Sequence, residues 1–138
     1  MAEELQYDEL EVYQASIRFV ELIEPLLTDL PSSRQAVKNL DQSSTLIPSC
    51  IAKGSYRPAE RSEQFQQAIE AALECSSSLD VLAAQDRIGT DTQSTGKELL
   101  EEVISGLSGE VSELSTKQSG KQQKTGYQVG GNPANSTL

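Results

Sequence analysis

The chain has 138 residues and a formal net charge of −10, because 11 Lys and Arg stand against 21 Asp and Glu. It contains no His, no Trp and two Cys, and aromatic residues make up 4% of it. Without His there is no Ser-His-Asp or Cys-His triad, no His-ligated zinc and no Glu-x-x-His di-iron pair. Two Cys cannot complete a Cys₄ zinc or iron–sulfur site within one chain. We therefore expect a protein that is not an enzyme and has no metal, cofactor or small-molecule substrate.

The first six residues read Met-Ala-Glu-Glu-Leu-Gln and lack the positive and apolar regions of a signal peptide. No apolar stretch approaches the roughly 20 residues that cross a bilayer. We expect a cytoplasmic protein that makes no membrane contact. The acidic charge also argues against a protein whose whole surface coats nucleic acid.

Four segments carry apolar residues at steps of three and four, and none shows sustained alternation with period two. This pattern predicts helices over about 8–30, 32–54, 58–87 and 95–117. Pro25 and Pro48 fall inside the first two segments, where each removes a backbone hydrogen bond. We expect a kink at Pro25 and a local bend or break at Pro48.

The connection between the second and third segments has the residues of a tight helical hairpin. Gly54 suits the C-terminal cap of one helix, and Pro58 suits the first turn of the next. On this geometry Cys50 lies about 6 Å and Cys75 about 25 Å from the turn, at 1.5 Å per helical residue. Because that offset is too large for a disulfide, we expect both to be small buried side chains.

The residues after Lys117 are mostly Gln, Ser, Gly, Lys, Thr and Asn, which cannot bury enough apolar surface to offset the entropy of ordering. We expect residues 7–117 to form an all-α, antiparallel up-down-up-down four-helix bundle and 118–138 to form a disordered polar tail. Gly106 and Gly109 lie in the last predicted helix and weaken it. They are either close-packing points or signs of a frayed helix end.

One run of sequence is more specific than helical periodicity. Residues 47–57 read Ile-Pro-Ser-Cys-Ile-Ala-Lys-Gly-Ser-Tyr-Arg, which resembles the Ile-Pro-x-x-Ile-Ala-x-Gly-x-x-Arg signature of the 23S rRNA intervening-sequence family of four-helix-bundle proteins. Residues 7–15 are similar to the opening of that family's first helix, and Leu30-Pro31 to its Phe-Pro ending. The positions that match the signature are Ile47, Pro48, Ile51, Ala52, Gly54 and Arg57.

The resemblance implies a four-helix bundle that assembles with copies of itself, as in the pentameric rings of the family. A relative of the family, the accessory variability protein of diversity-generating retroelements, partners a reverse transcriptase and binds nucleic acid. RNA, a ribonucleoprotein and a reverse transcriptase are therefore candidate partners. The chain departs from the family pattern at Cys50, where Asn is usual, and at Lys53 and Ser78, where Glu is usual. A polar network built from those residues would be altered here.

Charge is distributed unevenly along the chain. Residues 1–30 carry eight acids and one base, whereas 31–57 carry four bases and one acid. One interpretation is a binding site for an anion or an acidic partner around the hairpin turn, aided by the N-terminus of the third helix. The other is that the basic second helix pairs with the acidic first helix, within one subunit or between subunits. The candidate binding residues are Lys53, Arg57, Arg61, Arg34 and Lys38.

Two further clusters have simpler explanations than catalysis or metal binding. The three serines 76–78 have no base nearby in sequence, so packing or solvent exposure on a helix explains them better than nucleophilic chemistry. Glu98, Glu101 and Glu102 suit a solvated face beside Lys97 better than a metal site. The sequence therefore favours a non-enzymatic, homo-oligomeric adaptor for a ribonucleoprotein or protein partner. The alternatives are a self-assembling scaffold without nucleic-acid contact and an accessory protein of a reverse transcriptase.

Overall fold

The computed structural model describes the backbone of residues 6–122 and the side chains of residues 6–111. This part of the chain is all-helical, with four α-helices, two 3₁₀ turns and no strand. The elements, in chain order, are η1 (Tyr7–Glu9), α1 (Glu11–Asp29), α2 (Gln35–Tyr56), η2 (Pro58–Glu60), α3 (Arg61–Ala84) and α4 (Thr90–Gln122). The expected all-α class with four helices is confirmed.

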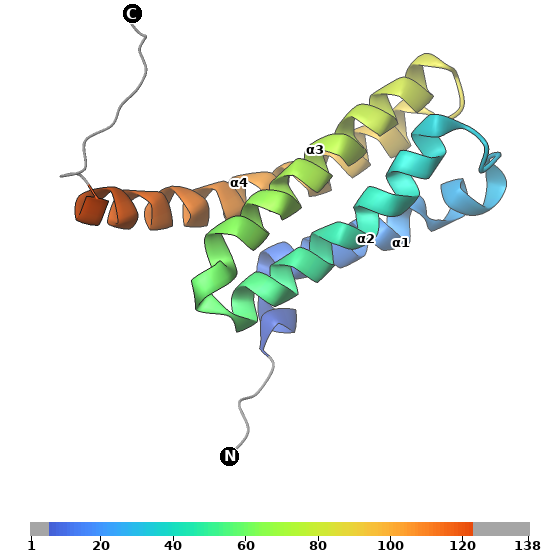
Figure 1. Cartoon of the computed structure of the whole chain (residues 1–138). Coiled ribbons are helices and arrows are strands. Elements are labelled where there is room, and N and C mark those ends of the chain that lie inside the picture. The colour runs from blue at the N-terminus through green and yellow to red at the C-terminus, as the bar shows by residue number, and fades with distance from the viewer. Residues whose placement is uncertain (1–5, 123–138) are drawn as a thin grey trace, which may run out of the picture.

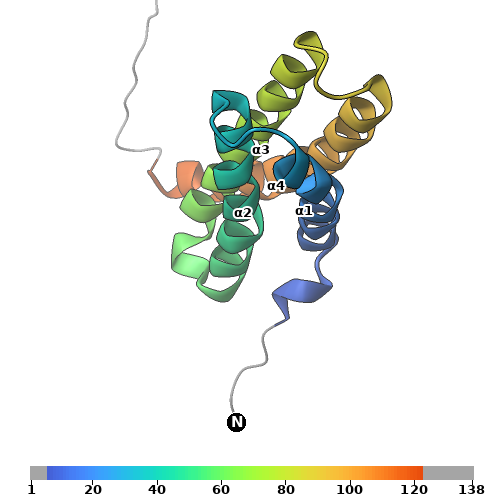
Figure 2. The ribbon, with the colours of Figure 1, turned by 90° about the vertical axis from the view of Figure 1, so that its right-hand side faces the viewer.

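Each α-helix packs against two others (Figures 1 and 2). α1 and α3 each lie beside α2 and α4, whereas the described backbones of α1 and α3, and those of α2 and α4, do not approach each other closely across the centre. The helices therefore enclose one apolar core that all four supply, because each turns a stripe of apolar side chains inward. Its largest fully buried side chains include Phe19, Ile23, Leu40, Ile47, Ile51, Leu79, Leu82, Leu100 and Leu107.

Neither internal proline interrupts its helix. α1 continues through Pro25 and α2 through Pro48, so of the two outcomes expected at Pro48, a bend or a break, the break does not occur. Ile47 and Ile51 lie on either side of Pro48 and are both fully buried. Packing of this apolar stripe holds the helix together where one backbone hydrogen bond is missing.

The ends of the helices differ from the sequence-based expectation in two places. α3 begins at Arg61, because Pro58 lies in the 3₁₀ turn η2 that precedes it. α4 begins at Thr90, five residues before the expected start at Thr95. In its first turn Gln93 Nε2 donates a hydrogen bond of 2.9 Å to Asp80 Oδ1 of α3, which ties the extra turn to the neighbouring helix.

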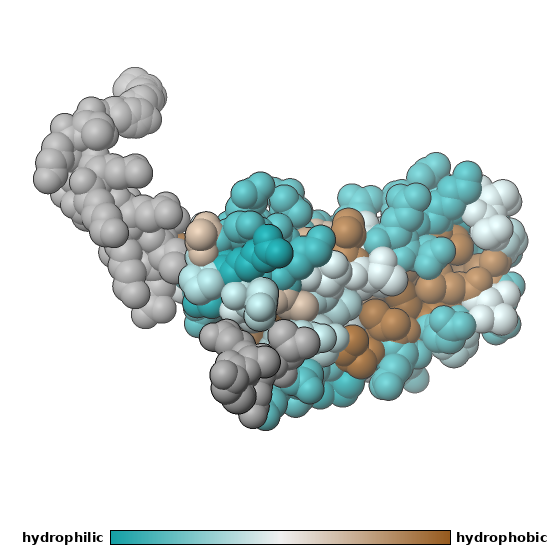
Figure 3. Space-filling view, turned by 60° about the horizontal axis from the view of Figure 1, so that its bottom comes forward, coloured by the Kyte–Doolittle hydropathy of each residue, from teal (hydrophilic) through white to brown (hydrophobic). Residues whose placement is uncertain are grey.

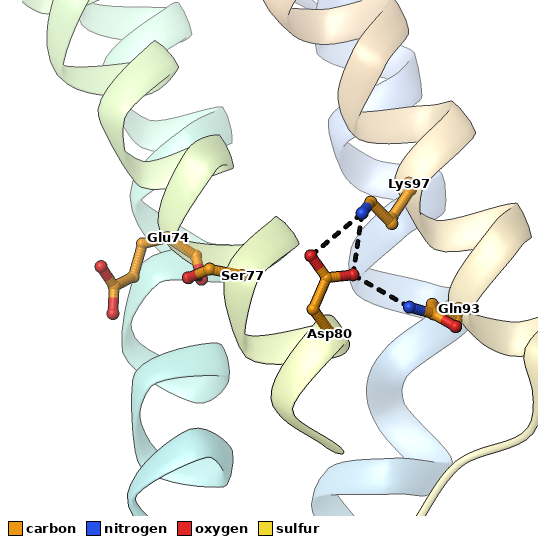
Figure 4. Close-up of polar contacts among 5 residues, drawn as sticks. All are labelled: Glu74, Ser77, Asp80, Gln93 and Lys97. Atoms are coloured by element: carbon orange, nitrogen blue, oxygen red, sulfur yellow. Dashed lines mark hydrogen bonds and ion pairs between the residues drawn. The ribbon is translucent and has the colours of Figure 1, made fainter. Parts of the chain in front are cut away.

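Lys97 extends this connection between α3 and α4 (Figure 4). Its Nζ lies 2.8 Å from Asp80 Oδ1 and 3.0 Å from Asp80 Oδ2. The hydrogen bonds from Lys97 and Gln93, together with the positive charge of Lys97, lower the pKa of Asp80. The three side chains cross-link α3 to α4 close to the connection between them.

The connection itself depends on one residue in the left-handed region. Asp86 has a φ of 60° and follows the end of α3. The Arg87 amide donates to the carbonyl of Leu82 at 2.8 Å, and the Asp86 amide donates to that of Ala83 at 3.0 Å. These are the two hydrogen bonds of a Schellman motif, which closes a helix and usually has Gly at the position of Asp86.

The two glycines of α4 that the sequence left ambiguous have different surroundings. A methyl group on Gly106 would collide with Val12 Cγ1 of α1, so Gly106 is a close-packing point. Gly109 has no atom within 4 Å of the place where its Cβ would lie. α4 also continues five residues past the expected domain boundary at 117, and the remainder of the predicted tail, 123–138, lies outside the described residues.

Apolar surface is visible on one face of the molecule. Figure 3 shows it as a stripe along the side formed by α1 and α2. Ile17, Val20 and Leu27 of α1 are only partly buried. Among the described residues, no helix is both long enough and apolar enough to cross a bilayer. A partly exposed stripe on a helix that carries many charges is typical of a surface that packs against another protein.

Candidate binding site at the α2–α3 turn

The turn between α2 and α3 is shaped by a close approach of the two helices at Gly54. A Cβ on this residue would lie 2.7 Å from Cε1 and 2.8 Å from Cδ1 of Phe65. α2 continues beyond Gly54 to Tyr56, so the expectation that Gly54 caps the helix is wrong. Gly54 is instead required because the aromatic ring of Phe65, which is 4% exposed, occupies the space of a side chain.

Arg61 fastens the end of α2 to the start of α3. Its Nε donates to the backbone oxygen of Gly54 and its Nη2 to that of Ser55, both at 2.9 Å. The last carbonyls of a helix lack partners within the helix, and a guanidinium that binds them also stabilises the negative end of the helix dipole. Two nitrogens of Arg61 are therefore committed to holding the turn.

Lys53 and Arg57 present the free positive charge of the turn. Lys53 is exposed, with no ion pair among the described residues. Arg57 Nη1 lies 3.6 Å from Glu60 Oε2, and both side chains are largely exposed, so the pairing is weak and easily exchanged. Tyr56 between them is 54% exposed. Two cations beside an aromatic ring can bind a phosphate or a carboxylate.

Arg34 and Lys38, the other two candidate residues, lie at the opposite end of α2. Fifteen residues separate Lys38 from Lys53, which corresponds to about 22 Å along the helix. Arg34 Nη1 donates to Gln85 Oε1 at 3.1 Å, close to the connection between α3 and α4. The five cations therefore form two separate groups, and only Lys53, Arg57 and Arg61 lie together.

Among the described residues, no ion pair joins the acidic first helix to the basic second helix. The ion pairs of the described residues join Arg18 to Glu102, Arg57 to Glu60, and Lys97 to Asp80. None of them connects α1 with α2. The described residues thus form no direct ion pair between these helices within one subunit, and charge complementarity between α1 and α2, within or between subunits, stays a prediction.

A cavity of about 740 Å³ opens beside the turn. It is bounded by η1 and the start of α1, the end of α2, the start of α3, and the middle of α4. The residues that line it include Glu9, Leu10, Glu11, Val12, Ser55, Tyr56, Arg61, Phe65, Leu107 and Glu110. Sequence reasoning missed this cavity, because its residues come from four separate segments whose meeting point no local pattern reveals.

The family-like residues 47–57 serve mainly to pack α2. Ile47 and Ile51 are fully buried in the core, and Gly54 accommodates Phe65. Cys50 and Cys75 are buried free thiols, as expected from their spacing. Burial raises the pKa of both thiols, that of Cys75 to about 12, so neither is a reactive nucleophile. No cluster of acidic or Cys residues among the described residues could hold a metal ion.

Comparisons with models of protein families, with curated proteins and with solved structures find no match to this chain. The likeness of residues 47–57 to the intervening-sequence family thus remains a prediction. The features of this chain that bear on its function are therefore the charged turn, the apolar stripe and the cavity.

Proposed function

We propose that this protein is a non-enzymatic, homo-oligomeric interaction protein that uses the α2–α3 turn to bind an acidic partner. Its four helices form an antiparallel up-down-up-down bundle, which the pairwise helix contacts support. In line with the family resemblance, the partner is a ribonucleoprotein or a protein, and the site of action is the cytoplasm. Binding relies on presentation of charge from a rigid turn.

The three cations at the turn have different roles, and this difference supports the proposal. Arg61 is held by two backbone carbonyls, whereas Lys53 and Arg57 stay outward on the structure that Arg61 fixes. Because the turn is also locked by the contact between Gly54 and Phe65, little conformational entropy is lost when an anion binds there.

Self-association has its own support in the surface of α1 and α2. The apolar stripe of Figure 3 gives a second copy an area to bury, and the hydrophilic surface that flanks it sets the orientation. Several copies in one assembly would present several turns, which converts a weak anion contact into tight binding. A self-assembling scaffold without any nucleic-acid partner is the second candidate, because the same stripe supports it.

The experiment compares two single charge reversals on one helix. Lys53→Glu alters the proposed site, and Lys38→Glu is the matched control, since both lysines are exposed on α2 without an ion pair among the described residues. Each full-length protein is purified without nuclease and examined by size-exclusion chromatography with light scattering and absorbance at two wavelengths. With four Tyr and no Trp, the protein absorbs weakly, so bound nucleic acid is easily detected.

We expect the wild type and the Lys38→Glu variant to elute as the same oligomer with the same bound partner. Lys53→Glu should keep the oligomer but lose the partner. If both reversals release the partner equally, the binding depends on overall charge and the proposed site is wrong. A monomeric wild-type protein would contradict the oligomeric part of the proposal, and an oligomer that carries no partner would favour the scaffold.

A further inference from the structure

The cavity beside the α2–α3 turn combines an apolar floor with an acidic rim. Leu10, which is 38% exposed, and the partly buried Val12 supply apolar surface to this floor, whereas Phe65 and Leu107, which also border the cavity, are buried in the core. Its volume of about 740 Å³ falls within the range of sites that take a ligand or a few residues of a peptide. The floor favours an apolar group, because burial there removes its surface from water.

Three carboxylates lie on the walls of the cavity. Glu9 of η1, Glu11 of α1 and Glu110 of α4 are all exposed. None of these carboxylates has a hydrogen bond or an ion pair with another described residue. The carbonyl end of α2 adds partial negative charge to the same space, although Arg61 offsets part of it. Three carboxylates thus stand against one cation, Arg61, among the charged residues that line the cavity, and this balance favours a cationic ligand.

Two other features suit the cavity to a peptide. Tyr56 lines it with a ring that is 54% exposed and can stack against a lysine or arginine side chain. Ser55 also lines it, and its hydroxyl oxygen is buried without a hydrogen-bond partner among the described residues. Because the carboxylates come from three elements spread around the floor, they match several positive charges that flank one apolar group.

We propose that this cavity is a docking site for a basic peptide segment of a partner protein, in which a leucine-sized apolar side chain is flanked by lysine or arginine. The apolar side chain occupies the floor against Leu10 and Val12. The flanking cations pair with Glu9, Glu11 and Glu110. This site adjoins the proposed anion contact of Lys53 and Arg57, since Tyr56 borders both, but it selects a ligand of the opposite charge.

The test measures binding of defined peptides to the full-length protein by fluorescence anisotropy. The main probe is a labelled nonapeptide with one central leucine and two lysines on each side, filled with glycine. Two control peptides replace the leucine by serine or the lysines by glutamate, and hexylamine competes as a free amine. Amide chemical shifts in NMR spectra locate the binding, with Gly106 as a reporter in the cavity wall.

Two triple variants with the same change in net charge separate local from general electrostatics. Glu9→Gln, Glu11→Gln and Glu110→Gln together neutralise the rim. Glu21→Gln, Glu70→Gln and Glu74→Gln neutralise three exposed carboxylates that do not line the cavity. Far-UV circular dichroism confirms that both variants fold.

We expect the leucine–lysine peptide to shift the Gly106 amide and to bind about tenfold more weakly to the rim variant than to the wild type or the control variant. Several results would overturn the proposal. These are no binding of this peptide, equal loss in both triple variants, equal binding of the serine peptide, or displacement by hexylamine at the same concentration as by unlabelled peptide.

Discussion

Replacement of Gly54 by alanine tests whether the approach of α2 to α3 at the turn is as close as the structure indicates. In a helix interior, alanine is about 1 kcal/mol more favourable than glycine. The new methyl group would lie 2.7 Å from Phe65 Cε1 and 3.1 Å from Gln64 Cβ, which is well inside van der Waals contact. Forcing such a group into a packed core costs about 1–3 kcal/mol.

Gly109→Ala is the matched control on α4. It brings the same gain in helix propensity, but no atom lies within 4 Å of the new methyl group. We therefore expect Gly109→Ala to raise the free energy of unfolding by about 1 kcal/mol. Gly54→Ala should be less stable than Gly109→Ala by about 1–3 kcal/mol. Both variants gain the same helix propensity, so the difference between them is the steric cost at Gly54 alone.

Urea unfolding followed by circular dichroism measures both free energies, and thermal unfolding should separate the midpoints by about 4 °C for each kcal/mol. The double variant Gly54→Ala with Phe65→Leu adds a check, since the smaller side chain should reduce the cost of the methyl group. Equal stabilisation by Gly54→Ala and Gly109→Ala would refute the close approach, and with it the rigid turn on which the proposed anion contact depends.

Three further outcomes follow from the connection between α3 and α4 and from the apolar stripe. Asp86→Gly should raise the free energy of unfolding by up to about 1 kcal/mol in a urea titration, because glycine adopts a positive φ without strain; a loss of stability would contradict the Schellman geometry. Asp80→Asn should lower stability by about 0.5 kcal/mol near neutral pH, where the ion pair with Lys97 is formed. The pKa of Asp80 is lower in the folded than in the unfolded protein, so Asp80 stabilises the fold above its unfolded pKa and loses this effect as pH falls through its folded pKa. The urea midpoints of the wild type and Asp80→Asn should therefore converge in acid, and a difference that stays constant with pH would contradict this linkage. Val20→Glu should dissociate the proposed oligomer, as measured by light scattering, whereas Leu73→Glu should not, because Leu73 lies on α3 and is 53% exposed. If both variants dissociate, the apolar stripe is not the interface.

The helices and much of the core were predictable from periodicity. Ile23, Leu40, Ile47 and Leu79 stand at apolar steps of three or four within the predicted helices, and all four are fully buried. A stripe with steps of three and four identifies the inward face of a helix whatever the neighbouring helix is. The early start of α4 was not predictable, because its first turn is held by Gln93, a polar residue whose partner lies on another helix.

The candidate site was predictable only in part. Sequence reasoning grouped Lys53, Arg57 and Arg61 at the turn, and they lie at the end of α2 and the start of α3, while their role in binding stays a prediction. It could not separate Arg61 from the others, because the carbonyls that bind its guanidinium have no signature in the sequence. The role of Gly54 was misassigned for a similar reason. A capping glycine and a close-packing glycine look alike until the neighbouring ring of Phe65 is in place.

The two buried thiols can report how often the helices around them separate. Cys75 of α3 is fully buried and Cys50 of α2 is 3% exposed, with its sulfur 3.8 Å from Gln67 Oε1. A thiol reagent can reach either sulfur only when the surrounding helices separate, so the labelling rate reports how often they do. Equal rates at the two positions would mean that α2 and α3 come apart in a single event, whereas faster labelling of Cys50 would reveal a smaller opening near the turn. In a chain without Trp, this chemistry can follow motions that fluorescence would miss.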